Sequence, residues 1–342
     1  MALRLPLLLV VVVAAVASCR PGRADPAMSV LPGLPVAGLA VGFYNESCPQ
    51  VEDLVLAEMR CLVGKDKTIG PALLRFMFHD CLVRGCDASI MLISRNKTGE
   101  RDAIPSYGLR GYEEIEHIKA KVEDACPLTV SCADIIVMAA RDAVHLSNGP
   151  RYAVETGRRD GKVSADCDAN NDLPPPSSKI VDLKTYFSFK GLGWKDLVVL
   201  SGSHTIGRAQ CSTFASDRLY NYSGHVGQDP SLNKTYAAQL REQCEPGVAD
   251  DATMVEMDPG SPYTFDLSYY RDVRSNRGLF SSDQALLDDP WTRAYVERMA
   301  AASASPDEFF ADYAAAMTNM GRIQVLTGDN GEIRKLCAAH VD

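Results

Sequence analysis

Apolar residues recur every three or four positions through most of the chain, which is the spacing of one face of a helix. In residues 51–63, for example, Val51, Leu54 and Val55 share a face with Met59. Segments of this kind span residues 51–63, 69–79, 110–124, 133–146, 180–190, 194–200, 232–243, 290–302 and 306–319. The alternation typical of a strand is weak and is confined to residues 152–156. The pattern therefore predicts a mainly α fold with very little β structure.

Two long stretches, residues 147–178 and 245–265, show neither spacing. Apolar residues and cysteines continue through both of them, so neither has the composition of a flexible linker. No internal repeat is present. We therefore expect a single domain over residues 41–342.

The N-terminal end has a different composition. Arg4 precedes an apolar run over residues 5–16, and small residues such as Ala17 follow. This order predicts a secretory signal peptide within residues 1–24, with its cleavage site left open. The alternative is a membrane anchor, but the run is shorter than the roughly 20 apolar residues that span a bilayer. Residues 25–40, rich in Pro, Gly and Ala, are expected to form a disordered lead-in.

Charge and glycosylation motifs fit an exported protein. The net charge of −9 provides no electrostatic footprint for a nucleic acid, so no such partner is expected. Acceptor triplets for N-linked glycans begin at Asn45, Asn96, Asn221 and Asn233. Together with the predicted signal peptide, they indicate a secreted glycoprotein.

The chain has 11 cysteines, of which Cys19 falls in the signal region. An even number then remains, which in an exported chain favours disulfides. Zinc binding is the alternative, but only Cys81 and Cys86 lie close together and no Cys-x-x-Cys is present. The cysteines therefore predict a covalently braced fold.

The most informative polar residues lie in the apolar segment 69–79. On a helix Arg75 and His79 are four residues apart and share one face, with Phe78 beside them. A cation and an imidazole in so apolar a segment are costly unless they line a wet cavity. The alternative is a buried Arg–His pair whose hydrogen bonds go to main-chain carbonyls.

Oxygen-bearing residues follow this segment at short spacing. Asp80, Gly85, Asp87 and Ser89 have the arrangement that suits a hard cation, most simply calcium. The alternative is a solvated acidic turn. A bridge between the cysteines at 81 and 86 would hold the loop rigid, and a solvated turn would not need it.

At this point the sequence resembles a known family. Arg-x-x-Phe-His-Asp-Cys, at residues 75–81, followed by Gly-Cys-Asp-Ala-Ser, at 85–89, is similar to the distal motif of the plant secretory (class III) haem peroxidases. The similarity runs from about Gly42 to Cys337. It implies the haem peroxidase fold, with about ten helices in two halves around a buried haem b. It also implies an enzyme that reduces hydrogen peroxide to water and oxidises phenolic donors in one-electron steps.

A second motif, over residues 196–207, resembles the proximal motif of the family and implies that His204 is the axial ligand of the haem iron. Small neighbours such as Gly202 and Gly207 would let a flat cofactor come close. The resemblance supplies Asp283 as the acceptor for the second ring nitrogen of His204. Taken alone, Asp283 could equally be a helix N-cap.

The resemblance implies further residue roles. His79 is the proton acceptor from peroxide, Arg75 stabilises the developing charge, and Phe78 and Glu100 support them. Two calcium sites are implied. Their ligands are Asp80, Val83, Gly85, Asp87 and Ser89 in one, and Thr205, Asp258, Ser261, Thr264 and Asp266 in the other. Pro174 matches a position beside the donor site.

The same resemblance implies four disulfides. They are Cys48–Cys126, Cys81–Cys86, Cys132–Cys337 and Cys211–Cys244. Cys61 and Cys167 have no partner in the usual pattern. We hypothesise that they form a fifth bridge, the alternative being two free thiols.

One position departs from the family pattern. Members usually carry Asn after Glu-x-x-Ala-x-Pro, where it accepts a hydrogen bond from the distal His, and this chain has Ser106. The shorter hydroxyl predicts slower reaction with peroxide. Two alternatives to the enzyme remain open, a non-catalytic secreted haem-binding protein and a disulfide-rich binding module without haem. The enzyme is expected to be monomeric, without a membrane span, and located in the extracellular space or cell wall.

Overall fold

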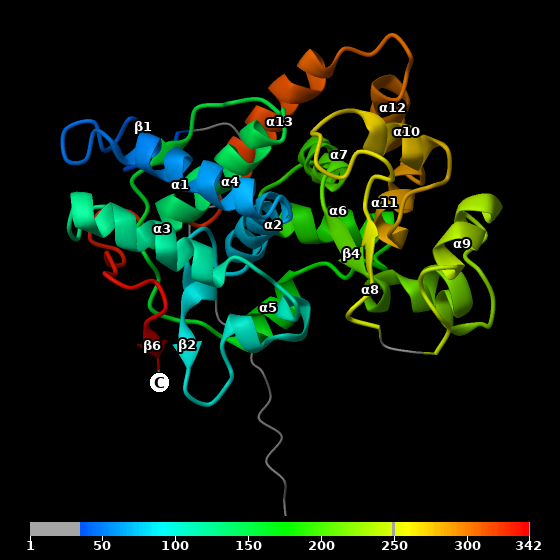
Figure 1. Cartoon of the computed structure of the whole chain (residues 1–342), viewed down its shortest axis with the longest axis horizontal. Helices are drawn as coiled ribbons and strands as arrows, with labels where there is room; N and C mark the ends of the chain where they lie inside the picture. Colours follow the sequence, from blue (N-terminus) through cyan, green and yellow to red (C-terminus); the bar gives the residue numbers. More distant parts are fainter. Residues whose placement is uncertain (1–34, 248–249, 342) are drawn as a thin grey trace, which may run out of the picture.

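The computed structural model describes residues 35–247 and 250–341, so the predicted signal peptide lies outside the described part. Helices dominate that part, which confirms the mainly α class (Figure 1). The α-helices are α1 (Val51–Lys65), α2 (Ile69–Leu82), α3 (Tyr112–Ala125), α4 (Cys132–Leu146), α5 (Asp166–Asp172), α6 (Ile180–Phe189), α7 (Trp194–Ser201), α8 (Cys211–Ala215), α9 (Lys234–Arg241), α10 (Ser268–Arg274), α11 (Ser281–Gln284), α12 (Pro290–Met299) and α13 (Pro306–Met320).

Every segment with helical spacing forms a helix in the structure. These helices are α1–α4, α6, α7, α9, α12 and α13. The other four, α5, α8, α10 and α11, have only four to seven residues. They were not predicted, because fewer than two turns do not repeat an apolar position often enough to reveal a period.

Strands are short and occur in pairs. β1 (Ala40–Val41) is antiparallel to β3 (Glu155–Thr156), β2 (Ile93–Ser94) is parallel to β6 (His340–Val341), and β4 (Arg208–Gln210) is antiparallel to β5 (Met254–Glu256). The weak alternation at 152–156 therefore marks a strand of two residues. Ala40, which we expected in the lead-in, already belongs to β1.

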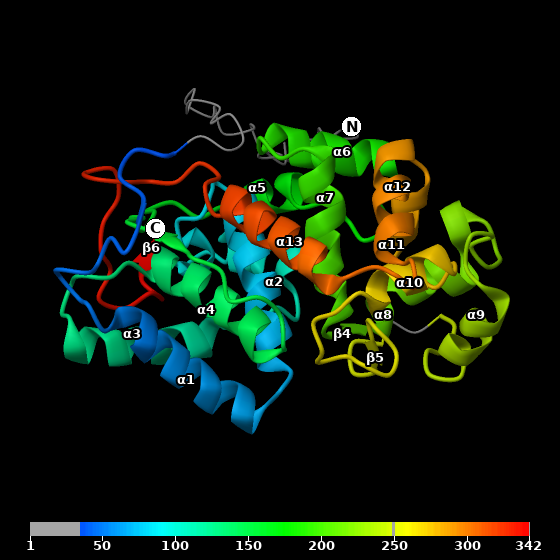
Figure 2. The same ribbon diagram turned by 90° about the horizontal axis from the view of Figure 1, so that it is seen from above.

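The helices form two groups. α1–α4 pack together on one side, and α7, α10 and α12 pack on the other (Figures 1 and 2). α4 lies inside the first group, with every residue from Cys132 to Val144 buried. α13 packs along α7 and also reaches α2, so it joins the groups (Figure 2).

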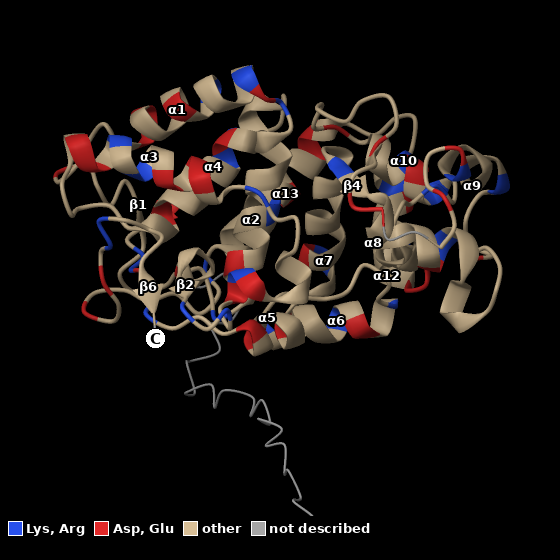
Figure 3. Cartoon of the chain, turned by 60° about the horizontal axis from the view of Figure 1, so that its bottom comes forward, with Lys and Arg blue, Asp and Glu red and all other residues tan. Residues whose placement is uncertain are grey.

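Both acidic and basic residues occur along α1, α3 and α6, where Figure 3 shows red and blue positions on the ribbon. Within the described residues, no helix has both the length and the apolar character needed to cross a membrane.

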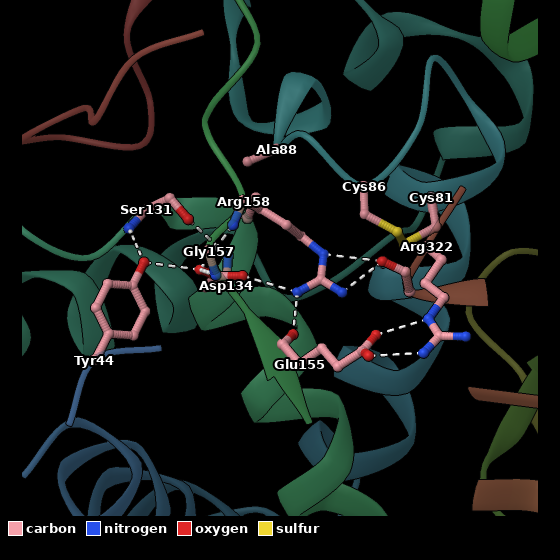
Figure 4. A network of polar contacts seen from close by, with 12 residues as sticks. Tyr44, Cys81, Cys86, Ala88, Ser131, Asp134, Glu155, Gly157, Arg158 and Arg322 are labelled. Atoms are coloured by element: carbon pink, nitrogen blue, oxygen red, sulfur yellow. Dashed lines mark hydrogen bonds and ion pairs between the residues drawn. A yellow bond between two sulfur atoms is a disulfide. The ribbon is translucent and has the colours of Figure 1, made fainter. Parts of the chain in front are cut away.

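A buried carboxylate ties the first group to the end of α13. Asp134 of α4 accepts hydrogen bonds from Tyr44 Oη at 2.7 Å, from the Gly157 amide at 2.7 Å and from Arg158 Nη1 at 2.8 Å (Figure 4). The Arg158 Nε donates in turn to the Gly321 carbonyl at 3.0 Å. Both charged side chains are almost fully buried, and each is satisfied by several partners, which is the condition for keeping charge in a core.

Four disulfides brace the described chain as the resemblance implied. They are Cys48–Cys126, Cys81–Cys86, Cys132–Cys337 and Cys211–Cys244. The third has a sequence separation of 205 residues and fixes the C-terminal segment to α4. The hypothesised fifth bridge is wrong. Cys61 is a free, exposed thiol on α1, whereas Cys167 is disulfide-bonded, so the two are not joined.

Candidate active site

Arg75 and His79 meet on one face of α2, as their spacing predicts. Arg75 Nε donates a hydrogen bond of 3.2 Å to His79 Nε2, and its Nη2 donates to the Pro105 carbonyl at 3.0 Å. Because Nε2 accepts, its lone pair lies on the side of the guanidinium, and the ring proton is on Nδ1. The Phe78 ring stands edge-on to the His79 ring, with centroids 6.0 Å apart. A base, a fixed cation and an aromatic side chain are thus brought together.

His79 is buried, with 5% of its surface exposed. Burial, reinforced by the charge of Arg75, lowers the pKa of His79 well below the usual imidazole range. The imidazole is therefore neutral at physiological pH. In this form Nε2 can accept a proton.

The segment after Glu100 gives Ser106 a partner other than His79. Ser106 lies in a short helical turn, and its hydroxyl donates to the Glu100 carbonyl at 2.6 Å. Within the described residues, His79 Nδ1 is buried without a hydrogen-bond partner. The departure at position 106 therefore leaves the inner nitrogen of the imidazole without the acceptor expected there.

Buried oxygens gather beside the C-terminal end of α2. Asp80 Oδ1, Ser89 Oγ and both carboxylate oxygens of Glu100 have no hydrogen-bond partner among the described residues. Burial, together with the charge of Asp87, raises the pKa of Asp80 well above its usual range, and burial raises the pKa of Asp87 to about 6. Buried acidic oxygens that accept no hydrogen bond are the kind of ligand that a hard cation such as calcium requires.

His204 lies on the other helix group, in the helical turn that continues α7. Its Nδ1 is 2.7 Å from Asp283 Oδ1, and Asp283 is 2% exposed. The Phe280 ring stands edge-on to the imidazole at 5.4 Å. With Nδ1 held by a carboxylate, Nε2 is the ring nitrogen that can bind a metal, and the partner makes it a stronger ligand.

Asp283 contacts His204 but is not the N-cap of a helix. It is the third residue of α11, and while one carboxylate oxygen receives the His204 contact, the other accepts the amide of the N-cap residue, Phe280, at 2.9 Å. Tyr269, which we did not predict, donates its hydroxyl hydrogen to Asp283 Oδ1 at 3.0 Å. Its position directly before a second tyrosine on a short helix gave no periodic signal.

The second oxygen cluster follows His204. The Thr205 hydroxyl lies 3.1 Å from Asp258 Oδ2 and 3.4 Å from Asp266 Oδ1. Ser268, which we did not predict, hydrogen-bonds to both carboxylates. Burial raises the pKa of Asp258 to about 6. The cluster therefore keeps two carboxylates close together, with the hydroxyls of Thr205 and Ser268 and the Ser268 amide as their donors.

In neither cluster do three or more His, Cys, Asp or Glu side chains converge as ligands, nor elsewhere among the described residues. An ion bound at these positions would therefore depend on main-chain carbonyls and hydroxyls as well as carboxylates. Calcium accepts such mixed oxygen ligands.

The glycines near His204 pack against protein. A Cβ on Gly202 would meet the Tyr270 hydroxyl at 2.5 Å, and one on Gly207 would lie 3.0 Å from the Pro71 Cβ. On the side where a side chain would point, both glycines therefore face protein. The contact of Gly207 with Pro71 brings the start of α2 against the loop that follows His204.

The surroundings of Arg75 and His204 fit a large group between the helix groups. Arg75 is exposed, yet protein surrounds its guanidinium closely enough for desolvation to lower its pKa. The His204 side chain is 37% accessible although its Nδ1 is tied to a buried carboxylate. The residues present therefore fit a haem held by His204 Nε2.

Comparisons with known proteins decide the family. A profile of the family described as peroxidase matches residues 55–302. Peroxidase 1 of Oryza sativa subsp. japonica is 51% identical over 299 residues, covering 86% of this chain and 90% of the relative. Peroxidase 27 of Arabidopsis thaliana is 50% identical over 300 residues, covering 88% and 91%. The chain belongs to the plant class III peroxidase family.

As a class III peroxidase, the protein is an oxidoreductase that uses hydrogen peroxide, and the family implies a haem cofactor. Pro174, predicted beside the donor site, follows α5 at the edge of a surface hollow of about 620 Å³ that includes Pro175, Tyr186 and Phe189. This hollow is open and shares no residue with the His79 and His204 clusters. This hollow therefore lies apart from the two histidines.

Proposed function

We propose that this peroxidase is a secreted enzyme that reduces hydrogen peroxide to water and oxidises two phenolic donors, one electron from each. The observation that carries the proposal is a pair of histidines with different partners. His204 is tied to the buried carboxylate of Asp283 at 2.7 Å, and His79 to the guanidinium of Arg75 at 3.2 Å. A metal ligand needs the first kind of partner, and a proton acceptor in peroxide cleavage needs the second.

Each side chain has a role in the proposed reaction. His204 Nε2 would hold the iron of haem b, and Asp283 would orient the ring. His79 Nε2 would accept a proton from the inner oxygen of peroxide and return it to the outer oxygen, which leaves as water. Arg75 would stabilise the negative charge that develops as the O–O bond lengthens. When bound, haem supplies the redox chemistry that the protein side chains lack.

The remaining assignments belong to the same proposal. Phe78 would line the peroxide site and keep donors at the cofactor edge, near Pro174. Two calcium ions would bind the oxygen clusters after α2 and after His204, which would fix both histidines in place. The disulfides are typical of proteins in an oxidising compartment, which supports secretion to the extracellular space or cell wall. We propose that the mature protein is a monomer formed by one domain.

An absorption spectrum before and after one equivalent of peroxide tests the proposal, followed by turnover of a phenolic dye. We expect a Soret band that shifts with peroxide and returns as the dye is oxidised. A Soret band without turnover would establish the non-catalytic haem-binding alternative. The absence of a Soret band in the purified protein would rule out both.

Position 106 offers a prediction about peroxide reactivity. We expect Ser106→Asn to raise the second-order rate constant for reaction with peroxide, because an amide oxygen can reach the unpartnered Nδ1 of His79 and make Nε2 a stronger base. Stopped-flow measurement of the Soret change gives the rate constant. Ser106→Ala is the control, since it removes the bond to Glu100 without supplying an acceptor. An unchanged rate constant in the Asn variant would contradict the prediction.

A further inference from the structure

The only two tryptophans of the chain lie together on its surface. Trp194 is the first residue of α7, and Trp291 is the second residue of α12. Their ring centroids are 5.9 Å apart at an interplanar angle of 33°. Trp291 is 62% exposed and Trp194 is 37% exposed. Indole rings this accessible leave much apolar area in water, so their position calls for an explanation other than core packing.

Local contacts hold this pair in place. Asp289 caps α12 by accepting the Trp291 amide at 2.9 Å, and it also accepts Lys184 of α6 at 2.6 Å. Next to Trp194, Lys195 donates to Asp312 of α13 at 2.6 Å. α12 packs directly on α7, and Figure 2 shows the two helices side by side. The two rings are therefore presented by fixed helix ends.

A series of aromatic side chains leads inward from α12, starting one helical turn after Trp291. Tyr295 lies four residues after Trp291 on α12 and so shares its face. The Tyr295 ring lies 5.8 Å from that of Tyr270, which lies 5.2 Å from that of Tyr269. The Tyr269 ring is 6.0 Å from the imidazole of His204. These separations are in the range of directly interacting aromatic rings.

The tyrosines at both ends of the series have a carboxylate as hydrogen-bond acceptor. Tyr269 donates to Asp283 Oδ1 at 3.0 Å and Tyr295 to Asp312 Oδ2 at 3.0 Å, while Tyr270 donates to the Val198 carbonyl at 3.1 Å. All three rings are buried. A phenol that loses an electron becomes a strong acid, and a hydrogen-bonded carboxylate can hold its proton until the electron returns. If these three rings only filled the core, neither their hydroxyl groups nor the hydrogen-bond acceptors would be needed.

We propose that Trp194 and Trp291 form a second donor site, at which phenolic groups of a polymer give up electrons that travel inward along Tyr295, Tyr270 and Tyr269 to the His204 side of the haem site. The inference rests on the proposed function, because the peroxide reaction supplies the oxidant. A phenol group bound to a large molecule cannot enter a recess between helices, but it can touch an exposed indole.

The electrons and protons of the proposed route balance. One indole gives one electron inward and its N–H proton to solvent. A phenol at the surface then returns one electron and one proton to the indole and becomes a phenoxyl radical. Two such events supply the two electrons, and the two released protons replace those taken up inside, as one hydrogen peroxide becomes two waters. The tyrosines and tryptophans are unchanged after each cycle.

Two substrates and two variants test the proposal. The holoenzyme is assayed with a free phenol and with the same phenol coupled to a soluble polymer. In Trp194→Phe/Trp291→Phe we expect oxidation of the polymer-bound phenol to fall by about tenfold or more, while oxidation of the free phenol stays unchanged. Phe43→Leu, which alters an exposed aromatic residue outside the series and away from Pro174, is the matched control and should leave both rates unchanged.

Tyr295→Phe separates electron transfer from binding of the polymer. It keeps both tryptophans and the ring packing but replaces an oxidisable phenol with a benzene ring, so the polymer rate should again fall. A mere docking surface would leave that rate unchanged. A readout independent of turnover is a nitroso spin trap added with peroxide and no donor. Peptide mapping should place the adduct on Trp194 or Trp291 in the native protein, and no adduct should form at these positions in the double variant.

The outcomes distinguish this inference from the function on which it rests. If the native holoenzyme fails to oxidise the free phenol, the proposed function fails. If it oxidises the free phenol but the double variant oxidises the polymer as fast as the native enzyme, the second donor site is refuted. An adduct found only on residues outside the aromatic series would refute it as well.

Discussion

His79→Gln lowers the second-order rate constant for reaction with hydrogen peroxide by about 10²–10⁴-fold, the usual contribution of a positioned general base. The imidazole is buried and neutral, and its Nε2 lies 3.2 Å from Arg75 Nε. Nε2 can therefore accept a proton from peroxide next to the guanidinium that stabilises the negative charge. A glutamine fills similar space and can still accept from Arg75, but its amide does not take up a proton. The change therefore removes the base and keeps the contact.

Stopped-flow spectroscopy at several peroxide concentrations measures this rate constant. The Soret band of the variant before peroxide should match that of the native protein, because His204 and Asp283 are untouched. His117→Gln is the control, since its ring forms a half-exposed contact with Glu58 at 3.0 Å on the outer helices. A His79 variant that reacts with peroxide at the native rate would remove His79 from the reaction.

The second large effect concerns stability. Asp134→Asn should lower the free energy of unfolding by about 3–5 kcal/mol, because it leaves the buried guanidinium of Arg158 without its counter-charge. The carboxylate also accepts from Tyr44 and from the Gly157 amide (Figure 4). An asparagine has one acceptor oxygen for these donors, and its amide nitrogen would face another donor.

Denaturant unfolding of the oxidised protein, followed by far-ultraviolet circular dichroism, measures this loss. Glu308→Gln is the matched control, since its pair with Arg298 is half-exposed at both ends and should contribute less than about 1 kcal/mol. If both variants lost the same small amount, the buried network would not be a main contributor to stability.

The sequence predicted the long helices well, because an apolar face that repeats over three or more turns has few other structural solutions. It also predicted the contact between Arg75 and His79, which depends only on helical geometry. The pairing of His204 with Asp283 is different, since 79 residues separate them. Only the resemblance to the family could join them beforehand.

The predictions that were wrong or missing have specific causes. The bridge between Cys61 and Cys167 was inferred because the family pattern left these two cysteines without partners, and a sequence does not give the distance between them. Ser268 and Tyr269 were missed because α10 is too short to show a period.

The disulfide between Cys132 and Cys337 has a consequence for fragments of the protein. The segment that it closes contains both His204 and Asp283, as well as most of the second helix group. A single protease nick in an exposed loop within this segment would leave the two pieces covalently joined. Under non-reducing conditions such a nicked molecule would still migrate as one species, and the halves of the haem site would stay tethered long enough to re-form.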